Sequence, residues 1–500
     1  MIITRRPLLL GAAAAGLMAA NAYAQSASDF MGEWHGALDL GSQRLRLRLV
    51  VAEGPTATLY SIDQGNGAIP VQSTAISNGE LTLTIPVISA SYRGRLDNGR
   101  IEGQFTQGGT LPLVFTREEV GAAAGPEALT QQSLAAMRAE AGAPAFAAAA
   151  RNRDGRAINY ADGLRALGRP EQVTTSDLWH IGSITKSMTA TLVARCVEAG
   201  EISWDDTIGS VMGGVIPDMR AQYRDVTFRH LLSHRAGLVS NLEWSEILSF
   251  QRENPDPRQE RIQYARLGLT RDPAGPKGEH FEYSNTGYVI AGAMLEQKLG
   301  ASWETLIRQR VFDPLGMASA GFGAPGTPGA YDQPVGHGPG ILAVAAGNRG
   351  SEVAPYPPGG AITDNVAALG PAGRVHTSFT DLFKFLDAHR DRTSFLRRET
   401  WDTLHTPPFG GPYAMGLAQR SGALWHNGSK TLWYAEVLID PARGISAIAA
   451  TNDGRPEIMG RPVGAALVGA AQAVASRRSA LGQCAFALRM RRGMSCCQRC

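Results

Sequence analysis

Hydrophobic and polar residues alternate along the first quarter of the chain. Residues 45–49 have the sequence Leu-Arg-Leu-Arg-Leu and residues 81–85 have Leu-Thr-Leu-Thr-Ile, a period of two that is typical of half-buried strands. Turns rich in asparagine and glycine separate such runs, at residues 63–67, 78–79 and 97–99. Residues 29–117 are therefore predicted to form a small antiparallel β domain, either a barrel or a sandwich.

The rest of the chain mixes helical and extended patterns. An alanine- and glycine-rich linker at residues 118–126 precedes a predicted helix over residues 127–141, and a hairpin is predicted over residues 145–160. Near the C-terminus, two apolar runs at residues 434–439 and 445–450 predict strands. A chain of 500 residues suits two folded units, so residues 127–475 are expected to form one larger α+β domain.

Two aromatic residues of the N-terminal β domain, Trp34 and Tyr92, allow two interpretations. They are suitable for lining a ligand groove, but buried aromatics are common in the core of a small β domain, and the core interpretation is favoured. The domain shows no catalytic constellation.

Composition favours a soluble globular protein. Hydrophobic residues make up 44% of the chain and charged residues 19%, and the formal net charge is +3. This charge balance gives no reason to expect a nucleic-acid partner.

The N-terminus predicts an exported protein. Thr4-Arg5-Arg6 precedes an apolar run at residues 8–20, and Ala22-Tyr23-Ala24 offers the small residues that a signal peptidase prefers, so residues 1–24 are predicted to be a signal peptide. Adjacent arginines are typical of twin-arginine signals and occur in ordinary Sec signals too. The apolar run is too short for a stable membrane span. The mature protein is therefore expected to be periplasmic or secreted.

The cysteines give no disulfide framework for the folded body, because Cys196 stands alone there. Four others lie in the arginine-rich segment at residues 476–500. A Cys497-x-x-Cys500 pair suggests zinc or redox chemistry, but it has no second pair, and a disordered tail is favoured.

A candidate nucleophile lies where the pattern changes from extended to helical. Residues 179–188 have the sequence Trp-His-Ile-Gly-Ser-Ile-Thr-Lys-Ser-Met, and apolar side chains then recur every four residues until Gly200. Residues three apart share a helix face, so Lys186 is expected beneath the hydroxyl of Ser183, where a desolvated neutral amine can take its proton. No other lysine follows a serine by three positions. The pair predicts nucleophilic catalysis by Ser183.

A second candidate group is Tyr283-Ser284-Asn285, and no other tyrosine of the chain is followed by asparagine two positions later. A tyrosine held near a lysine can shuttle protons, and an asparagine can orient the lysine and a substrate amide. The alternative is an ordinary turn before a helix predicted over residues 287–299.

The third candidate group is Trp425-His426-Asn427-Gly428-Ser429, which is predicted to be an edge strand. Glycine at position 428 would let a substrate approach the backbone. The backbone NH of Ser429, with that of Ser183, would then form an oxyanion hole with two donors.

The order Ser-x-x-Lys, Tyr-x-Asn, His-x-Gly resembles the serine beta-lactamase-related superfamily, which includes class C beta-lactamases, DD-peptidases, D-aminopeptidases and related esterases. The resemblance extends from about residue 142 to residue 472. It also includes His-Leu-Leu-Ser-His-Arg-Ala-Gly-Leu at residues 230–238, Asp-Pro-Leu-Gly-Met at 313–317 and Pro-Ala-Gly-Arg-Val at 371–375. It implies an α+β beta-lactamase/transpeptidase-like fold, with an antiparallel sheet flanked by helices and an all-helical subdomain.

The resemblance also implies roles for individual residues. Ser183 would be the nucleophile, Lys186 its activating base, Tyr283 a proton shuttle, and Asn285 a partner of the lysine and the substrate. His426 stands where the beta-lactamases usually have the lysine of Lys-Thr-Gly. Since histidine carries a charge only when it is protonated, recognition of a substrate carboxylate at neutral pH is expected to be weak.

Two other kinds of site are disfavoured. His230 and His234 are four apart, as in zinc proteases, but Leu231 replaces the glutamate of His-Glu-x-x-His, so a structural role is favoured. No serine has the Gly-x-Ser-x-Gly setting of an α/β-hydrolase. No metal and no organic cofactor is expected.

The sequence therefore predicts an exported serine hydrolase that forms an acyl-enzyme on Ser183 and hydrolyses a small ester or amide. The alternatives are a class C-like beta-lactamase or a DD-carboxypeptidase acting on a lactam or a peptidoglycan-derived peptide. A further alternative is a penicillin-binding sensor or scaffold that turns substrate over poorly.

Overall fold

The computed structural model describes residues 27–39, 44–62, 67–107, 109–118, 127–340, 352–360, 362–420, 422–430 and 432–475. The predicted signal peptide and C-terminal tail lie outside the described residues, as does the predicted linker apart from its first residue. The chain divides into two compact units between Ala123 and Ala124. The domain bounds given above stay predictions.

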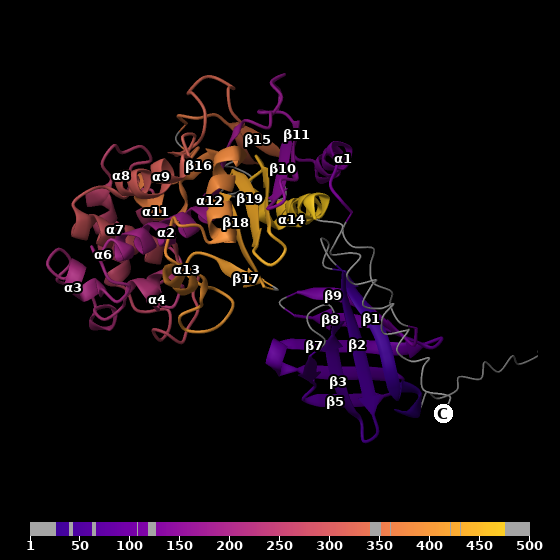
Figure 1. Cartoon of the computed structure of the whole chain (residues 1–500). Helices are drawn as coiled ribbons and strands as arrows, with labels where there is room; N and C mark the ends of the chain where they lie inside the picture. Colours follow the sequence, from indigo (N-terminus) through magenta and orange to yellow (C-terminus); the bar gives the residue numbers. More distant parts are fainter. Residues whose placement is uncertain are drawn as a thin grey trace, which may run out of the picture. The chain divides into compact units, whose positions relative to one another are not determined.

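The N-terminal unit contains a nine-stranded sheet in the order β4-β3-β2-β1-β9-β8-β7-β6-β5, in which all neighbours are antiparallel (Figure 1). Because β3 also contacts β5, the two ends of this sheet approach each other. The strands are β1 (Gly32–Asp39), β2 (Arg44–Ala52), β3 (Thr56–Ser61), β4 (Ala68–Pro70), β5 (Ser73–Ser77), β6 (Glu80–Ile85), β7 (Ala90–Asp97), β8 (Arg100–Thr106) and β9 (Thr110–Thr116).

Both aromatic residues singled out in this unit belong to its core. Trp34 and Tyr92 are each 1% exposed. The indole of Trp34 donates to the carbonyl of Phe30 at 2.7 Å, and the phenol of Tyr92 lies 3.1 Å from the carbonyl oxygen of Ile101. Their polar atoms are therefore satisfied inside the fold, as a buried aromatic requires.

The C-terminal unit is built on a six-stranded antiparallel sheet in the order β11-β10-β20-β19-β18-β17. The hairpin that opens the unit thus pairs with the strands that nearly close it. The strands are β10 (Ala145–Asn152), β11 (Ala157–Gly163), β17 (Ala418–Arg420), β18 (Ala423–Lys430), β19 (Trp433–Asp440) and β20 (Ile445–Thr451).

Helices cover both faces of this sheet. Helices α1 (Gln131–Ala141) and α14 (Pro456–Val474) pack on one face, where Phe146, Ala148 and Ala150 of β10 meet them (Figure 1). The alternate residues of β10 face the other core, to which α2 (Thr185–Glu198) and α12 (Phe379–Asp391) contribute. A strand with two buried faces explains why β10 is an almost continuous run of alanine and phenylalanine.

Most of the helices other than α1 and α14 lie between β11 and β17 in the sequence. Apart from α12, which packs on β19 and β20, they form a largely helical subdomain beside the sheet (Figure 1). The α-helices described between β11 and β17 are α2 (Thr185–Glu198), α3 (Ile208–Met212), α4 (Phe228–Leu232), α5 (Trp244–Ile247), α6 (Arg258–Leu269), α7 (Asn285–Leu299), α8 (Trp303–Ile307), α9 (Asp313–Leu315), α11 (Gly370–Gly373), α12 (Phe379–Asp391) and α13 (Arg398–His405). Short strands join them: β12 (Leu178–His180), β13 (Gly321–Phe322) and β16 (Val375–Ser378) form one sheet, and β14 (Gly336–Pro339) pairs with β15 (Val353–Tyr356).

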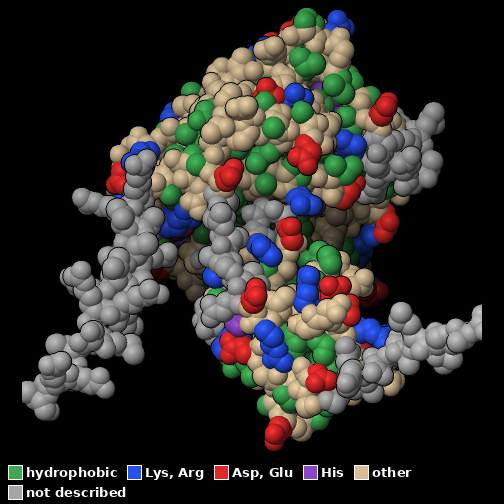
Figure 2. Space-filling model, turned by 90° about the vertical axis from the view of Figure 1, so that its right-hand side faces the viewer, with side chains coloured by type: hydrophobic (Ala, Val, Ile, Leu, Met, Phe, Trp, Pro, Cys, Tyr) green, Lys and Arg blue, Asp and Glu red, His purple; other side chains and the backbone are tan. Residues whose placement is uncertain are grey.

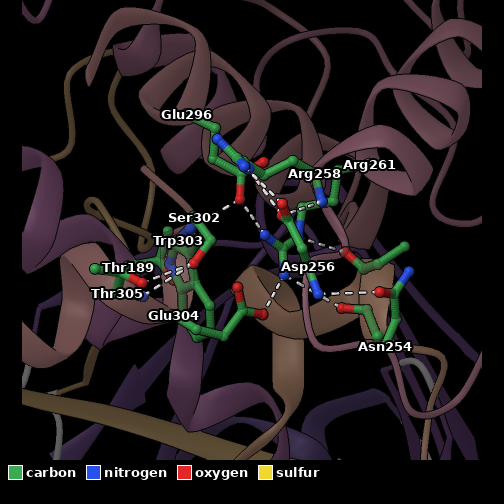
Figure 3. A network of polar contacts seen from close by, with 12 residues as sticks. Thr189, Asn254, Asp256, Arg258, Arg261, Glu296, Ser302, Trp303, Glu304 and Thr305 are labelled. Atoms are coloured by element: carbon green, nitrogen blue, oxygen red, sulfur yellow. Dashed lines mark hydrogen bonds and ion pairs between the residues drawn. The ribbon is translucent and has the colours of Figure 1, made fainter. Parts of the chain in front are cut away.

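A buried arginine links several helices of this subdomain through ion pairs and hydrogen bonds (Figure 3). The guanidinium of Arg261 on α6 forms ion pairs with Glu296 of α7 and with Glu304 of α8. Its Nε also donates to the carbonyl of Ala368 at 3.3 Å, just before α11. Nearby, Trp303 donates to Thr189 on α2 at 3.2 Å. The network therefore fixes the helices that surround α2.

Charged side chains of both signs are interspersed on the face shown in Figure 2, in keeping with the small net charge. Among the helices of the described ranges, none combines the length and apolar character that a membrane span requires.

The predicted fold class is confirmed: an antiparallel sheet flanked by helices follows an all-β N-terminal region. Four local expectations need correction. The helix predicted over residues 127–141 begins only at Gln131, because the side chain of Thr130 caps it by accepting from the NH of Ser133. Strand β18, which contains residues 425–429, is not the edge of its sheet, because β17 pairs with its first residues.

Ser183 lies in a 3-10 turn (Gly182–Ile184) immediately before α2, because Gly182 has a φ of +50° and cannot belong to the α-helix. Helix α7 begins at Asn285, two residues earlier than predicted, because the side chain of Ser284 caps it by accepting from the NH of Gly287.

Candidate active site

The three sequence motifs meet at one cleft of about 690 Å³ in the C-terminal unit. Ser183, Asn285 and Ser429 each line it. Its other described lining residues are Asn241, Leu242, Trp244, Ile247, Pro339, Asn365, Leu369, Ala372, Gly373, Gly454, Arg455, Pro456 and Glu457.

The turn that carries Ser183 is held by backbone contacts. The NH of Ile181 donates to the carbonyl of Val375 at 3.0 Å, and the NH of Gly182 donates to Nδ1 of His180 at 3.1 Å. His180 is itself buried, and its Nε2 lies 3.4 Å from Oδ1 of Asp364. The nucleophile candidate therefore projects from a rigid turn into the cleft.

Lys186 is buried beneath Ser183, one helical turn further on. Its Nζ lies 3.1 Å from the Ser183 hydroxyl oxygen, 2.6 Å from Oδ1 of Asn285 and 2.7 Å from the carbonyl oxygen of Ala372. Burial lowers the pKa of Lys186 well below its ordinary value, which favours the neutral amine. A neutral amine has two N–H groups and one lone pair. Asn285 and Ala372 accept the two N–H groups, so the lone pair is left for the Ser183 proton.

Tyr283 lies on the other side of this pair. Lys186 Nζ is 4.9 Å from the centroid of its ring, which places Tyr283 beside the buried amine. Burial raises the pKa of Tyr283, and the nearby Ser183 opposes this only in part. The phenol is therefore protonated at neutral pH and can donate a proton to a leaving group.

The amide of Asn285 has a fixed orientation. Its Oδ1 accepts from Lys186, and its Nδ2 donates to Oδ1 of Asn241 at 2.8 Å. Asn285 thus connects the buried lysine to one wall of the cleft.

His426 is buried and is absent from the described lining of the cleft. Its Nδ1 contacts the carbonyl of Asn427, an acceptor, so Nδ1 must carry the proton. Its Nε2 therefore accepts from the phenol of Tyr413, at 2.9 Å. Burial lowers the pKa of His426 to about 3, so this histidine is neutral at physiological pH.

Gly428 is where β18 touches the turn of Ser183. A Cβ added at this position would lie 1.9 Å from the carbonyl oxygen of Ile181 and 3.0 Å from the backbone nitrogen of Ser183. A Cβ at Gly182 would in turn lie 3.0 Å from the nitrogen of Ser429. This mutual close approach brings the backbones of Ser183 and Ser429 together at the cleft.

Sequence reasoning treated His234 as structural and did not connect it with Tyr283. The imidazole centroid of His234 lies 4.3 Å from the ring of Tyr283 and 4.7 Å from that of Tyr413. Its Nδ1 accepts from the NH of Ser284 at 3.0 Å, although the residue has a strained φ of +60°. His234 therefore positions the segment that carries Tyr283 and Asn285.

His230 does not share these contacts, since its Nδ1 bonds to Thr227 and its ring stacks on Phe409 at 4.4 Å. Within the described ranges, no group of three or more His, Cys, Asp or Glu residues is arranged to hold a metal ion. Tyr413 gave no signal in the sequence, because it lies outside all three motifs.

The charged groups of the cleft lie at the start of α14. Arg455 forms a two-point ion pair with the buried Asp453, at 2.9 Å and 2.6 Å, so much of its charge is neutralised. The carboxylate of Glu457 is exposed and has no ion pair among the described residues. The cleft lining therefore combines one ion-paired arginine with one exposed carboxylate.

The C-terminal unit is similar in sequence to known proteins. The family model described as Beta-lactamase matches residues 130–470. "Penicillin-binding protein 4" of Amycolatopsis lactamdurans is 26% identical over 344 residues, which cover 65% of this chain and 84% of that protein. "Esterase EstB" of Burkholderia gladioli is 26% identical over 386 residues, or 68% of this chain and 93% of that protein.

Among solved structures, D-amino acid amidase from Ochrobactrum anthropi SV3 has a similar fold. The TM-score is 0.55 at 22% identity, covering 67% of this chain and 97% of the amidase. At this identity the likeness establishes the fold alone.

Proposed function

The chain belongs to the beta-lactamase family of hydrolases, and from that premise we propose that it is a serine hydrolase that forms an acyl-enzyme on Ser183 and cleaves small uncharged esters or amides. The observation that carries the proposal is the buried amine of Lys186, 3.1 Å from the Ser183 hydroxyl and with both its N–H groups already accepted elsewhere.

Acylation begins when Lys186 takes the proton of Ser183 and the serine oxygen attacks the substrate carbonyl carbon. The carbonyl oxygen becomes an oxyanion, which the backbone NH groups of Ser183 and Ser429 stabilise. The tetrahedral intermediate collapses, the bond to the leaving group breaks, and Tyr283 donates a proton to the departing oxygen or nitrogen. The proton held by Lys186 then restores the phenol.

Deacylation reverses the roles. Lys186 and Tyr283 remove a proton from a water molecule, which attacks the acyl carbon, and Ser183 leaves with that proton. The products are the free acid and the alcohol or amine, and no cofactor is consumed.

The preference for uncharged substrates rests on electrostatics. The tautomer of His426, fixed by Asn427 and Tyr413, leaves this position without the cation that would attract a substrate carboxylate. Glu457 adds a negative charge to the same cleft. Esterase or peptidase-type hydrolysis is therefore favoured over a class C-like beta-lactamase or a DD-carboxypeptidase. With its predicted signal peptide, the enzyme would act in the periplasm or outside the cell.

The test is intact-mass spectrometry of the purified protein, with product release followed in parallel, on p-nitrophenyl butyrate and separately on a chromogenic cephalosporin. We expect ester turnover with transient acylation and little lactam hydrolysis. Rapid cephalosporin turnover would instead favour the beta-lactamase, and a stable adduct without turnover would favour a penicillin-binding sensor.

Serine variants identify the acylated residue. Ser183→Ala should abolish labelling and turnover. Ser187→Ala is the matched control, because Ser187 lies four residues further on, in the first turn of α2, and its hydroxyl only donates to the carbonyl of Ile184. Labelling that survives Ser183→Ala would refute the assignment of the nucleophile.

A further inference from the structure

One wall of the cleft contains a tryptophan that is much more exposed than tryptophan usually is. Trp244, at the start of α5, is 65% exposed and lines the same cleft as Ser183. Tryptophan is usually largely buried, so an exposed indole beside a candidate nucleophile calls for an explanation. Within the described part of the chain, Trp244 has no aromatic partner, and its indole NH has no hydrogen-bond acceptor.

Three buried apolar residues continue this wall. Leu242, Ile247 and Leu369 are at most 8% exposed, and each contributes to the cleft lining. They also belong to the hydrophobic core of the C-terminal unit, which holds this part of the cleft in place. We call Leu242, Trp244, Ile247 and Leu369 the apolar wall.

The apolar wall is connected to the reacting groups through Asn241, which precedes Leu242. Its Oδ1 accepts from Asn285, whose own Oδ1 accepts from Lys186. A substrate carbonyl placed at Ser183 thus has an apolar surface on the Asn285 side and the Arg455–Glu457 segment elsewhere in the cleft.

The neighbouring Leu248 allows a substrate-binding surface to be distinguished from an apolar surface that binds another protein. Leu248 is also exposed, at 52%, and follows α5 directly, but it is absent from the described lining of the cleft. If α5 served only to dock another protein, both side chains would matter. If the wall serves the substrate, only Trp244 should matter.

We propose that the apolar wall is the acyl subsite, and that the substrates are esters or amides of uncharged, hydrophobic acyl groups that lie against Trp244. The inference rests on the proposed hydrolase activity and specifies its substrate class. Burial of each methylene of the acyl chain against the wall removes apolar surface from water in the bound complex and in the transition state, and this raises kcat/KM.

The experiment measures kcat/KM for p-nitrophenyl acetate, butyrate and octanoate, which share one leaving group. For the wild-type protein, kcat/KM should rise by up to about fourfold per added methylene until the chain outgrows the wall. Trp244→Ala should lower the ratio of octanoate to acetate by about tenfold or more. Leu248→Ala, the matched control, should keep the wild-type ratio.

A second series tests which half of the substrate lies on the wall. Acetate esters of p-nitrophenol and 1-naphthol share the acyl group and differ in the alcohol. Trp244→Ala should change their ratio little. A loss that follows the alcohol would overturn the acyl assignment.

The possible negative results distinguish failure of the acyl subsite from failure of the proposed hydrolase activity. A wild-type protein that hydrolyses acetate but shows no preference for longer chains, or a Trp244→Ala variant that keeps the wild-type preference, overturns the acyl subsite alone. Equal losses in Trp244→Ala and Leu248→Ala overturn it too, because they point to a general surface effect. A wild-type protein that cleaves none of the esters overturns both the subsite and the hydrolase on which it rests.

Discussion

Replacing Gly428 with alanine would place a methyl group between strand β18 and the turn that carries Ser183. The added Cβ would lie 1.9 Å from the carbonyl oxygen of Ile181 and 2.8 Å from its carbonyl carbon. Both contacts are with backbone, so no flexible side chain can move aside. The strand and the turn must separate instead.

The required movement sets the size of the effect. The 1.9 Å approach is about 1.1 Å shorter than the 3.0 Å below which real Cβ contacts essentially do not occur. A displacement of about 1 Å between catalytic groups costs roughly a hundredfold in rate, and loss of one oxyanion donor costs about a hundred- to a thousandfold in kcat. Because the separation pulls Ser429 away from Ser183, we expect Gly428→Ala to lower kcat by at least about a hundredfold.

The assay is steady-state hydrolysis of p-nitrophenyl butyrate, with circular dichroism and thermal unfolding to verify that the variant folds. Gly214→Ala is the control, because a Cβ there meets nothing within 4 Å, and it should keep the wild-type kcat. If Gly428→Ala folds and keeps a kcat within about threefold of the wild type, the reasoning from the close approach is wrong.

Three further predictions follow from burial and charge. Because burial depresses the pKa of Lys186 and the neutral amine is the active form, kcat/KM should rise with pH along a limb that lies well below the ordinary lysine value of 10.5, as a pH–rate profile would show. His426 and His405 have pKa values of about 3 in the folded state, below the ordinary histidine pKa of 6.5. As the pH falls below 6.5, these histidines bind protons in the unfolded chain but not in the folded protein, so the folded state loses stability. The urea concentration at the midpoint of unfolding should therefore decrease steadily from pH 7 to pH 4. Arg261→Met should destabilise the fold by about 3–5 kcal/mol in urea unfolding, because it leaves Glu296 buried without its partner.

Each of these three predictions would be contradicted by a specific result. A kcat/KM limb at pH 10 or above would mean that Lys186 is charged in the resting enzyme. An unfolding midpoint that is constant between pH 7 and pH 4 would contradict neutral buried histidines. The control for the arginine is Arg266→Met on the same helix, whose ion pair with Asp218 is exposed and should contribute at most about 1 kcal/mol. Equal losses in the two variants would show that burial does not set the cost.

Much of the candidate site could be predicted because its chemistry is encoded locally. Ser183 and Lys186 are three residues apart where a 3-10 turn leads into α2, and this spacing puts the amine on the same side as the hydroxyl. Tyr283 and Asn285 were found by their rarity as a pattern, and the structure places both beside Lys186. The α+β class followed from periodicity and from the family resemblance of the motifs.

Other features had no local signal. Tyr413 and His234 act through contacts with residues that are distant in the sequence, 13 residues away for Tyr413 and His426 and 50 for His234 and Ser284. Trp244 is an ordinary residue of a short helix until the fold sets it beside Ser183. The 3-10 turn at Ser183 depends on the positive φ of Gly182, which the close approach of β18 requires.

The sequence by itself therefore determined the strand and helix periodicities, the fold class, and the residues that can act as nucleophile, base and proton donor, because spacing and side-chain chemistry are local properties. Only the tertiary structure decided the protonation of Lys186 and His426, the approach of Gly428 to Gly182, and the apolar wall at Trp244. These depend on desolvation and on distances between segments far apart in the chain, and no local pattern of residues specifies either.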